Sequence, residues 1–270
     1  MSINVLAPRT ALYLPASNPR AIAKARTLDV DMIILDLEDA VRDEDKEAAR
    51  AAAVEVVEQG MPGKSVGIRI NGTGTASHIP DIIAVKGSKA DFIVMPKVAS
   101  AAQCTAIATT VNKPMLAMIE TPRALYDCKI IASAPGVIGL IAGTNDLSYE
   151  LRIPIANDRL GLTLALQSII LAARTAAIWA LDGVFNDLAN PDGFRAQCQQ
   201  GRQYGFDGKT LIHPNQVEIA NVEFSPSKTE LEDARGLVEA ASGGAQRFRN
   251  RMIETMHVDM AKRLIERADE

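Results

Sequence analysis

The segment MIILDLEDAV, residues Met32 to Val41, joins an apolar run to three acids. The run is short and apolar on both faces, which is typical of a parallel strand covered by helices. Asp36, Glu38 and Asp39 stand at its end. Carboxylates in that position cost free energy unless they bind a metal, pair with a cation or reach solvent. The segment therefore predicts a buried strand that ends in a metal site, a proton-transfer site or a solvated turn.

Seven further apolar runs share this form, and helical patterns lie between them. The eight predicted strands are Ala11–Pro15, Met32–Leu37, Val66–Asn71, Phe92–Pro96, Met115–Glu120, Val137–Gly143, Ile178–Phe185 and Gly208–His213. Eight strand–helix alternations over about 210 residues favour a (β/α)8 TIM barrel. A doubly wound open sheet is the alternative architecture.

Two more helical patterns follow the last predicted strand, at residues 227–242 and 249–268, and Gly243 and Gly244 join them. They exceed what a barrel needs. We therefore expect a TIM-barrel catalytic domain over residues 1–224. A C-terminal helical extension over residues 225–270 is expected to pack on the barrel or on a neighbouring subunit.

Composition excludes several classes of protein. Hydrophobic residues make up 47% of the 270 residues and charged residues 23%, as in ordinary globular proteins. A net charge of −4, the lack of a Lys/Arg-rich block and 4% aromatic residues argue against a nucleic-acid partner. No apolar run is long enough for a membrane span, and three widely spaced cysteines indicate no disulfide framework. Without a signal-peptide pattern, a cytoplasmic location is expected.

Polar residues stand at most of the predicted strand ends. In a TIM barrel, the carboxyl ends of the strands carry the chemistry. We place at that rim Arg9, Asp36, Glu38, Asp39, Arg69, Asn71, Lys97, Glu120, Gly143, Thr144, Asn145, Asp146, Asp182 and His213. Their convergence predicts an active site there.

Glu120 and Asp146 follow adjacent predicted strands. Two carboxylates with waters and a substrate oxygen suit octahedral Mg2+. Alternatively, each acid caps the helix that follows it. The turn Gly143–Asn145 precedes a helix, so its backbone N–H groups could hold an anion, although such turns also simply end strands.

Arg69 is flanked by apolar residues in GIRIN, so its guanidinium must meet a carboxylate or a substrate anion. An ion pair of Arg69 with Asp36 or Glu38 from the neighbouring strand would be structural. The same pair would also hold the guanidinium in position for a substrate anion. His213 precedes Pro214 at a strand end, a position that favours a structural role.

Eight motifs, in order along nearly the whole chain, resemble the HpcH/HpaI aldolase and citrate lyase β-subunit superfamily. They read RTALYLPASNPRAIAKA, DMIILDLEDAV, GIRIN, IVMPKV, AMIETPRAL, GLIAGTNDLS, DGVFNDLANPDGF and GFDGKTLIHPNQVEIAN. Within the superfamily the chain is most similar to the CitE-like CoA-ester lyases, which include malyl-CoA and citramalyl-CoA lyases. The resemblance implies a TIM barrel that uses Mg2+, or Mn2+ in its place, and assembles as a homotrimer or hexamer.

The resemblance also implies roles for residues. Glu120 and Asp146 match the metal ligands, and Arg69 matches the arginine that contacts the substrate carbonyl. Arg9 matches an arginine near the thioester and its phosphates. Glu120 also belongs to the expected substrate-binding set.

The acids Glu38 and Asp39 match groups around the family's substrate arginine and the waters on the metal. Lys97 and the turn Gly143–Asn145, which includes Thr144, are expected to bind substrate. In malyl-CoA lyases a late aspartate in a MID segment transfers a proton, often across a subunit boundary. The matching residue here is Glu254, one methylene longer.

The implied reaction is retro-Claisen cleavage of a 3-hydroxy-dicarboxylic acyl-CoA into an acyl-CoA and a 2-keto acid. CoA then takes part as a portion of the substrate. Two alternatives use the same groups: hydrolysis of the malyl-CoA thioester, and action on an acyl-carrier thioester as a citrate lyase β-subunit. A third is a non-catalytic protein that binds CoA esters.

Overall fold

The computed structural model describes residues 7–154 and 158–268 and contains a closed barrel of eight parallel strands in the order β1 to β8. The strands are β1 Thr10–Pro15, β2 Met32–Asp36, β3 Ser65–Arg69, β4 Phe92–Met95, β5 Met115–Ile119, β6 Val137–Ala142, β7 Trp179–Asp182 and β8 Gly208–Leu211. The barrel prediction is confirmed, and the doubly wound sheet is excluded because β1 pairs with β8.

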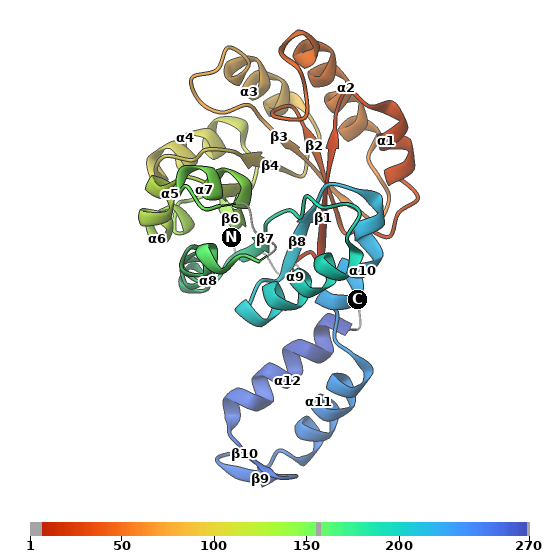
Figure 1. Cartoon of the computed structure of the whole chain (residues 1–270), viewed down its shortest axis with the longest axis vertical. Coiled ribbons are helices and arrows are strands. Elements are labelled where there is room, and N and C mark those ends of the chain that lie inside the picture. Colours follow the sequence, from red (N-terminus) through yellow and green to blue (C-terminus); the bar gives the residue numbers. More distant parts are fainter. Residues whose placement is uncertain (1–6, 155–157, 269–270) are drawn as a thin grey trace.

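Helices surround the barrel (Figure 1). They are α1 Pro19–Ala25, α2 Lys46–Gln59, α3 His78–Gly87, α4 Ala101–Val111, α5 Pro122–Tyr126, α6 Cys128–Ala132, α7 Thr144–Glu150, α8 Thr163–Ala176, α9 Pro191–Tyr204 and α10 Val217–Phe224. Side-chain caps start several of them: Asn18 accepts from the N–H of Ala21, and Ser100 from that of Gln103. Gly60 ends α2 at φ +68°, a backbone conformation that favours glycine.

Residues alternate along each strand between two separate cores. Met32 and Ile34 point into the barrel interior, whereas Ile33 and Leu35 pack against the surrounding helices. Asp36 has the parity of Ile34 and pairs with Arg69 in the β2–β3 register. The last residues of these two strands therefore point toward the axis of the barrel at its carboxyl-end mouth.

The C-terminal extension projects from the barrel as two helices that lie side by side (Figure 1). These are α11 Lys228–Ala240 and α12 Thr255–Ala268, and a short hairpin joins them, β9 Gln246–Phe248 and β10 Arg251–Ile253. A separate small core that includes Leu237 and Ile253 holds them together. Its docking on a neighbouring subunit stays a prediction.

The predicted helix over residues 249–268 is wrong in its first six residues. Residues 249–253 form the turn and second strand of the hairpin, and Glu254 follows them outside any helix. Asp233 on α11 forms ion pairs with both Arg249 and Arg251, which favours the hairpin locally. The helix begins only at Thr255.

Two sequence features have simple structural outcomes. Cys104, Cys128 and Cys198 are free thiols buried in the protein. In the part of the chain that the structure describes, no helix is long and apolar enough to cross a membrane.

Candidate active site at the carboxyl ends of the strands

A cavity of about 290 Å³ opens at the carboxyl-end mouth of the barrel. Acidic and polar groups line one part of it, and apolar side chains such as Met118, Ile141 and Val184 line another. Most of the predicted strand-end residues reach it. Its charged or amide-bearing lining residues are Asp36, Asp39, Arg69, Glu120, Asn145, Asp146 and Asn186.

Arg69 is fixed by Asp36 through a bidentate ion pair. Arg69 Nε and Nη2 donate to the two carboxylate oxygens of Asp36, each over 2.6 Å. Asp36 also accepts the backbone N–H groups of Glu38 and Ala40. Because Asp36 is saturated by these four bonds, it holds the arginine and has no lone pair left to bind an ion directly. The predicted pairing of Arg69 with the neighbouring strand is confirmed.

Glu38 lies next to Arg69 but keeps one oxygen unbonded. Its Oε2 is 3.1 Å from Arg69 Nη1 in an ion pair, outside hydrogen-bond geometry, and finds no hydrogen-bond partner among the described residues. Lys97 Nζ is 3.5 Å from Oε1. Asp39 is farther out: its side chain is 61% exposed and 3.6 Å from Arg69 Nη1. Glu38 is thus the buried acid of the pair, and Asp39 lies at the rim.

Glu120 points into the cavity from the end of β5, and the backbone of Lys97 supports it. Lys97 has φ +48°, an uncommon conformation for a residue with a side chain, and its N–H donates to Glu120 Oε1 over 2.5 Å. The Lys97 side chain is half exposed and lines an adjoining cavity with Glu38 and Lys46. Lys97 therefore contributes through its main chain as well as its ammonium group.

Gly143 lets Glu120 occupy this position. A Cβ atom at Gly143 would lie 2.2 Å from Glu120 Cβ and 2.7 Å from its Oε2. The N–H of Gly143 donates to the carbonyl of Ile119. This corrects the expectation that the amide of Gly143 holds an anion, because the sheet already uses it. Gly143 instead provides space for the carboxylate.

The first turn of α7 carries Thr144, Asn145 and Asp146 to the same cavity. Thr144 Oγ1 is buried without a hydrogen-bond partner among the described residues. Asn145 and Asn186 exchange side-chain hydrogen bonds, the shorter over 2.7 Å, so the loop after β7 is tied to α7. Asp146 is half-buried beside Glu120.

The electrostatics of the two buried glutamates are compatible with a bound cation. Burial is the main factor that raises the pKa of Glu38 to about 7, and nearby Asp39 adds to it despite Arg69. Burial likewise raises the pKa of Glu120 to about 7, although the Lys97 N–H opposes the shift. A divalent ion would relieve this excess of negative charge.

The donor set fits Mg2+ with a small number of protein ligands. No group of three or more His, Cys, Asp or Glu side chains within residues 7–154 and 158–268 is arranged to hold an ion. Glu120 and Asp146 therefore could hold a metal only together with water or substrate oxygens. Mg2+ accepts this arrangement, since it usually keeps several waters and takes one or two carboxylates.

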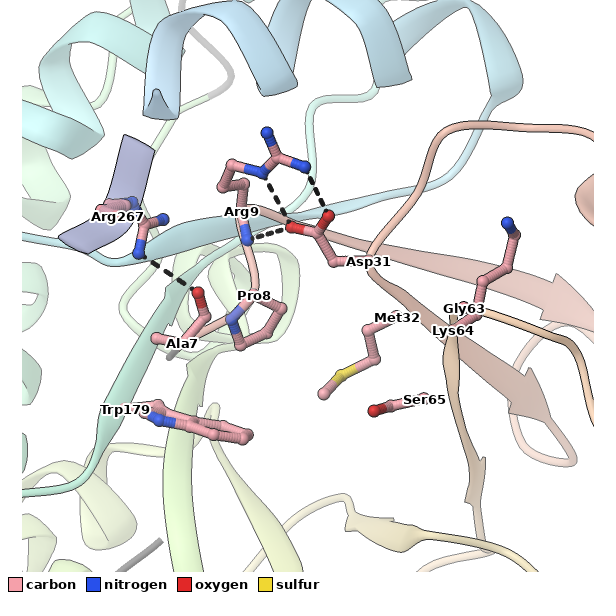
Figure 2. Close-up of a pocket in the computed structure, with 10 residues that line it drawn as sticks. All are labelled: Ala7, Pro8, Arg9, Asp31, Met32, Gly63, Lys64, Ser65, Trp179 and Arg267. Atoms are coloured by element: carbon pink, nitrogen blue, oxygen red, sulfur yellow. Dashed lines mark hydrogen bonds and ion pairs between the residues drawn. The ribbon is translucent and has the colours of Figure 1, made fainter. Parts of the chain in front are cut away.

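Arg9 does not belong to this mouth, which corrects its placement at the rim. It precedes β1 and so lies at the amino ends of the strands, in a separate cavity of about 510 Å³ (Figure 2). There Arg9 forms a bidentate pair with Asp31, at 2.7 Å from Nη2 to Oδ1. Arg267 of α12 donates to the carbonyl of Ala7 in the same cavity (Figure 2). A role for Arg9 at the reaction centre therefore has no geometric support within one chain.

Glu254 is also distant from the cavity. It follows β10 at the end of the extension farthest from the barrel (Figure 1), and its N–H donates to His257 Nδ1. Its role as an acid or base thus stays a prediction that requires another copy of the chain. His213 is exposed and caps a short helical turn by accepting from the N–H of Asn215.

Sequence reasoning missed Asn186 and also Tyr13 inside the site. Tyr13 points inward from β1, and its ring lies under the guanidinium of Arg69, with 4.9 Å from Cζ to the ring centroid. The inward parity it shares with Ala11 could have indicated this position.

Asp182 was expected at the rim but faces outward, into a buried ion cluster behind β7 and β8. Asp182 accepts from Arg159 Nη1 over 2.6 Å and from Lys209 Nζ over 2.9 Å. Lys209 Nζ also donates to the carbonyl of Gly183 and to Gln197 Oε1. Three acceptors match the three N–H bonds of an ammonium group, which favours the charged form of Lys209 although burial lowers its pKa.

Comparison with known proteins places this geometry in a family of enzymes. Residues 9–214 match the family described as HpcH/HpaI aldolase/citrate lyase, and residues 166–270 match a C–C bond lyase family of the TIM-barrel fold. The chain is 40% identical to a (3S)-malyl-CoA thioesterase of Cereibacter sphaeroides over 97% of its own length and 94% of that protein.

Two further similarities cover nearly the whole chain. Citrate lyase subunit beta of Haemophilus influenzae is 30% identical, with 96% of each chain covered. The crystal structure of CitE from Mycobacterium tuberculosis in complex with magnesium, acetoacetate and coenzyme A has a TM-score of 0.85 at 30% identity. That comparison covers 98% of this chain and 99% of CitE.

Proposed function

This chain belongs to the HpcH/HpaI aldolase/citrate lyase family, and from that premise we propose that it is a Mg2+-dependent enzyme that hydrolyses a malyl-CoA-type thioester. The observation that carries the proposal is the buried, partly unbonded carboxylate of Glu38 beside the fixed guanidinium of Arg69. Together they supply a base for water and a donor for the oxyanion.

Glu120 and Asp146 would hold the metal, with Gly143 leaving room for the Glu120 side chain. Bound Mg2+ would supply Lewis-acid polarisation and charge neutralisation for the carboxylate and hydroxyl oxygens of the substrate. The CitE complex with magnesium, acetoacetate and coenzyme A supports this choice of ion and ligand class.

Arg69 would stabilise the charge that develops on the thioester carbonyl oxygen. Two of its five N–H groups are held by Asp36, so the group is preorganised, and its Nη1 lies beside Glu38 Oε2 without a hydrogen bond to it. Glu38 takes a proton from a water whose oxygen attacks the thioester carbon. The C–S bond then breaks, and the CoA thiolate leaves and is protonated to CoA.

The CoA portion would extend from the mouth into the adjoining cavity of about 580 Å³. Its lining includes the ammonium groups of Lys46 and Lys97, which suit a ligand that carries phosphates. Lys46 Nζ is anchored on the carbonyls of Leu37 and Glu38, so that cation has a fixed position.

Carbon–carbon cleavage of the same substrate is the second candidate, supported by the similarity to citrate lyase subunit beta. It requires an acid that protonates the enolate carbon. Glu254 could act only from a second copy, as in a homotrimer or hexamer, because its own chain holds it away from the cavity. Hydrolysis needs no such acid, and the relative at 40% identity bears the name of a thioesterase.

Product analysis tests the proposal. The purified chain is incubated with Mg2+ and malyl-CoA, and the products are identified by mass. Hydrolysis gives malate and free CoA, whereas cleavage gives glyoxylate and acetyl-CoA. Malate as the main product, with loss of turnover in Glu38→Gln, is expected. Glyoxylate and acetyl-CoA would establish the second candidate instead, and no conversion at any Mg2+ concentration would refute both.

A further inference from the structure

Tyr13 carries a hydroxyl group that the fold uses for only a weak hydrogen bond. The side chain comes from β1 and lines the carboxyl-end cavity with Arg69, Met118 and Glu120. Its only hydrogen-bond acceptor in the described part of the chain is Met118 Sδ, at 3.7 Å. A thioether is a weak acceptor, whereas a tyrosine hydroxyl that leaves bulk water usually finds a strong one.

The ring alone already performs the structural tasks at this position. It stacks under the Arg69 guanidinium at 4.9 Å and packs on the interior core of the barrel. A phenylalanine could make both contacts. The hydroxyl of this partly buried side chain therefore adds a polar donor that packing does not require and that only the weak acceptor Met118 engages.

The surroundings keep this hydroxyl protonated. Burial raises the pKa of Tyr13 well above its ordinary value, and the carboxylates of Asp36 and Glu120 add to the shift although Arg69 opposes it. Tyr13 is thus a neutral donor whose position is fixed by the arginine that sits on its ring.

We propose that Tyr13 is a catalytic residue whose hydroxyl donates a hydrogen bond to the carbonyl oxygen of the bound thioester, as a second donor beside Arg69. The inference rests on the proposed thioester function and adds a residue to it. Two donors of different charge would contact one oxygen: the guanidinium and a phenol. Both are connected by the stack between ring and guanidinium, so each fixes the position of the other.

A pair of ligands isolates the carbonyl contact without turnover. Acetyl-CoA contains the thioester oxygen, and S-ethyl-CoA is a thioether analogue that lacks it. Affinities of both are measured by isothermal titration with Mg2+ present, for the wild-type chain, Tyr13→Phe and the control Tyr126→Phe. Tyr126 on α5 is 90% exposed, so its hydroxyl controls for the chemical change alone.

We expect Tyr13→Phe to weaken acetyl-CoA binding about tenfold and S-ethyl-CoA binding less than twofold, which is the loss of one good hydrogen bond. The turnover number should fall about 10- to 100-fold, and KM should rise by up to about tenfold because the same hydrogen bond to the ground-state carbonyl is lost. Tyr126→Phe should change neither.

Two results would overturn the inference in different ways. An unchanged preference for acetyl-CoA over S-ethyl-CoA in Tyr13→Phe removes the tyrosine from the oxyanion site and leaves the proposed function intact. Failure of the wild-type chain to bind either CoA derivative refutes the proposed function itself, and the role of Tyr13 with it.

Discussion

Two clusters of charge, on opposite sides of the same barrel wall, differ in the sign of their net charge and in how completely the fold satisfies their hydrogen bonds. The wall cluster consists of Arg159, Asp182 and Lys209, and the structure surrounds each of its charged atoms with partners. The mouth cluster consists of Asp36, Glu38, Asp39, Arg69, Lys97, Glu120 and Asp146, five carboxyl groups with two cations. The wall cluster, with two cations and one carboxylate, is fully hydrogen-bonded, whereas the mouth cluster carries an excess of carboxyl groups.

The buried carboxyl groups of the two clusters have pKa values that are shifted in opposite directions. Despite burial, the charges of Lys209 and Arg159 lower the pKa of Asp182. Burial raises the pKa of Glu38 and of Glu120 to about 7 in spite of nearby cations. Similar residue types thus have opposite pKa shifts in the two clusters, and the difference lies in the charges that surround them.

The largest effect is expected from Glu120→Ala. Loss of a metal ligand should lower Mg2+-dependent turnover by about a thousandfold or more, because metal polarisation contributes several kcal/mol. Circular dichroism should show an intact fold, and Glu150→Ala on the exposed side of α7 is the matched control. Full turnover in Glu120→Ala would mean that the metal binds elsewhere.

Lys209→Met tests the wall cluster. Removing one partner of a buried ion pair should lower the free energy of unfolding by about 3–5 kcal/mol. Urea denaturation at pH 7.5 measures the change, with the exposed Lys228→Met as control. A loss below about 1 kcal/mol would show that the wall cluster does not stabilise the barrel.

Arg69→Lys keeps the positive charge in the mouth cluster but removes the planar guanidinium. A point charge cannot reproduce the bidentate pair with Asp36 and a donor toward the substrate, so turnover should fall about 100- to 1,000-fold. Steady-state kinetics with the malyl-CoA-type substrate measures the fall. Near-normal turnover would remove Arg69 from the oxyanion site.

The smallest expected effects are changes of the free energy of unfolding with pH, and these changes differ between the two clusters. Glu38 and Glu120 have raised pKa values in the folded state, so they bind more protons there than in the unfolded chain. Their contribution to the free energy of unfolding is fully present below pH 4.5 and is lost as the pH rises toward 7. Asp182 has a lowered pKa, so its contribution is lost only as the pH falls below 4.

Glu38→Gln should therefore raise the metal-free stability at pH 8 by about 1–3 kcal/mol and leave it nearly unchanged at pH 4.5. Urea midpoints at the two pH values test this. An equal change at both would show that ionisation of Glu38 is not the cause.

Much of the barrel could be predicted from sequence because each buried parallel strand reads as a short apolar run. The pairing of Asp36 with Arg69 could be predicted because these residues end neighbouring parallel strands, and such strands end at the same rim of the barrel. Arg9 was misplaced because it stands before its strand, so the chain direction puts it at the opposite mouth. A residue just before a strand lies at the amino-end mouth of the barrel, whereas a residue just after it lies at the carboxyl-end mouth.

Other features depend on contacts that no local pattern contains. The need for glycine at Gly143 arises from the Glu120 side chain on the neighbouring strand. Arg159 reaches Asp182 from a loop 23 residues earlier. The hairpin before α12 depends on Asp233 of another helix. Such pairings become visible only once the strands and helices are in place.

Titration of Mg2+ into the metal-free chain at pH 8, followed by calorimetry, tests most directly whether the mouth cluster is a cation site. One ion per chain should bind, with an affinity at least tenfold lower in Glu120→Gln and in Asp146→Asn and unchanged in Glu150→Gln. Equal Mg2+ affinity in the wild-type chain and Glu120→Gln would contradict the assignment of the excess charge to a metal.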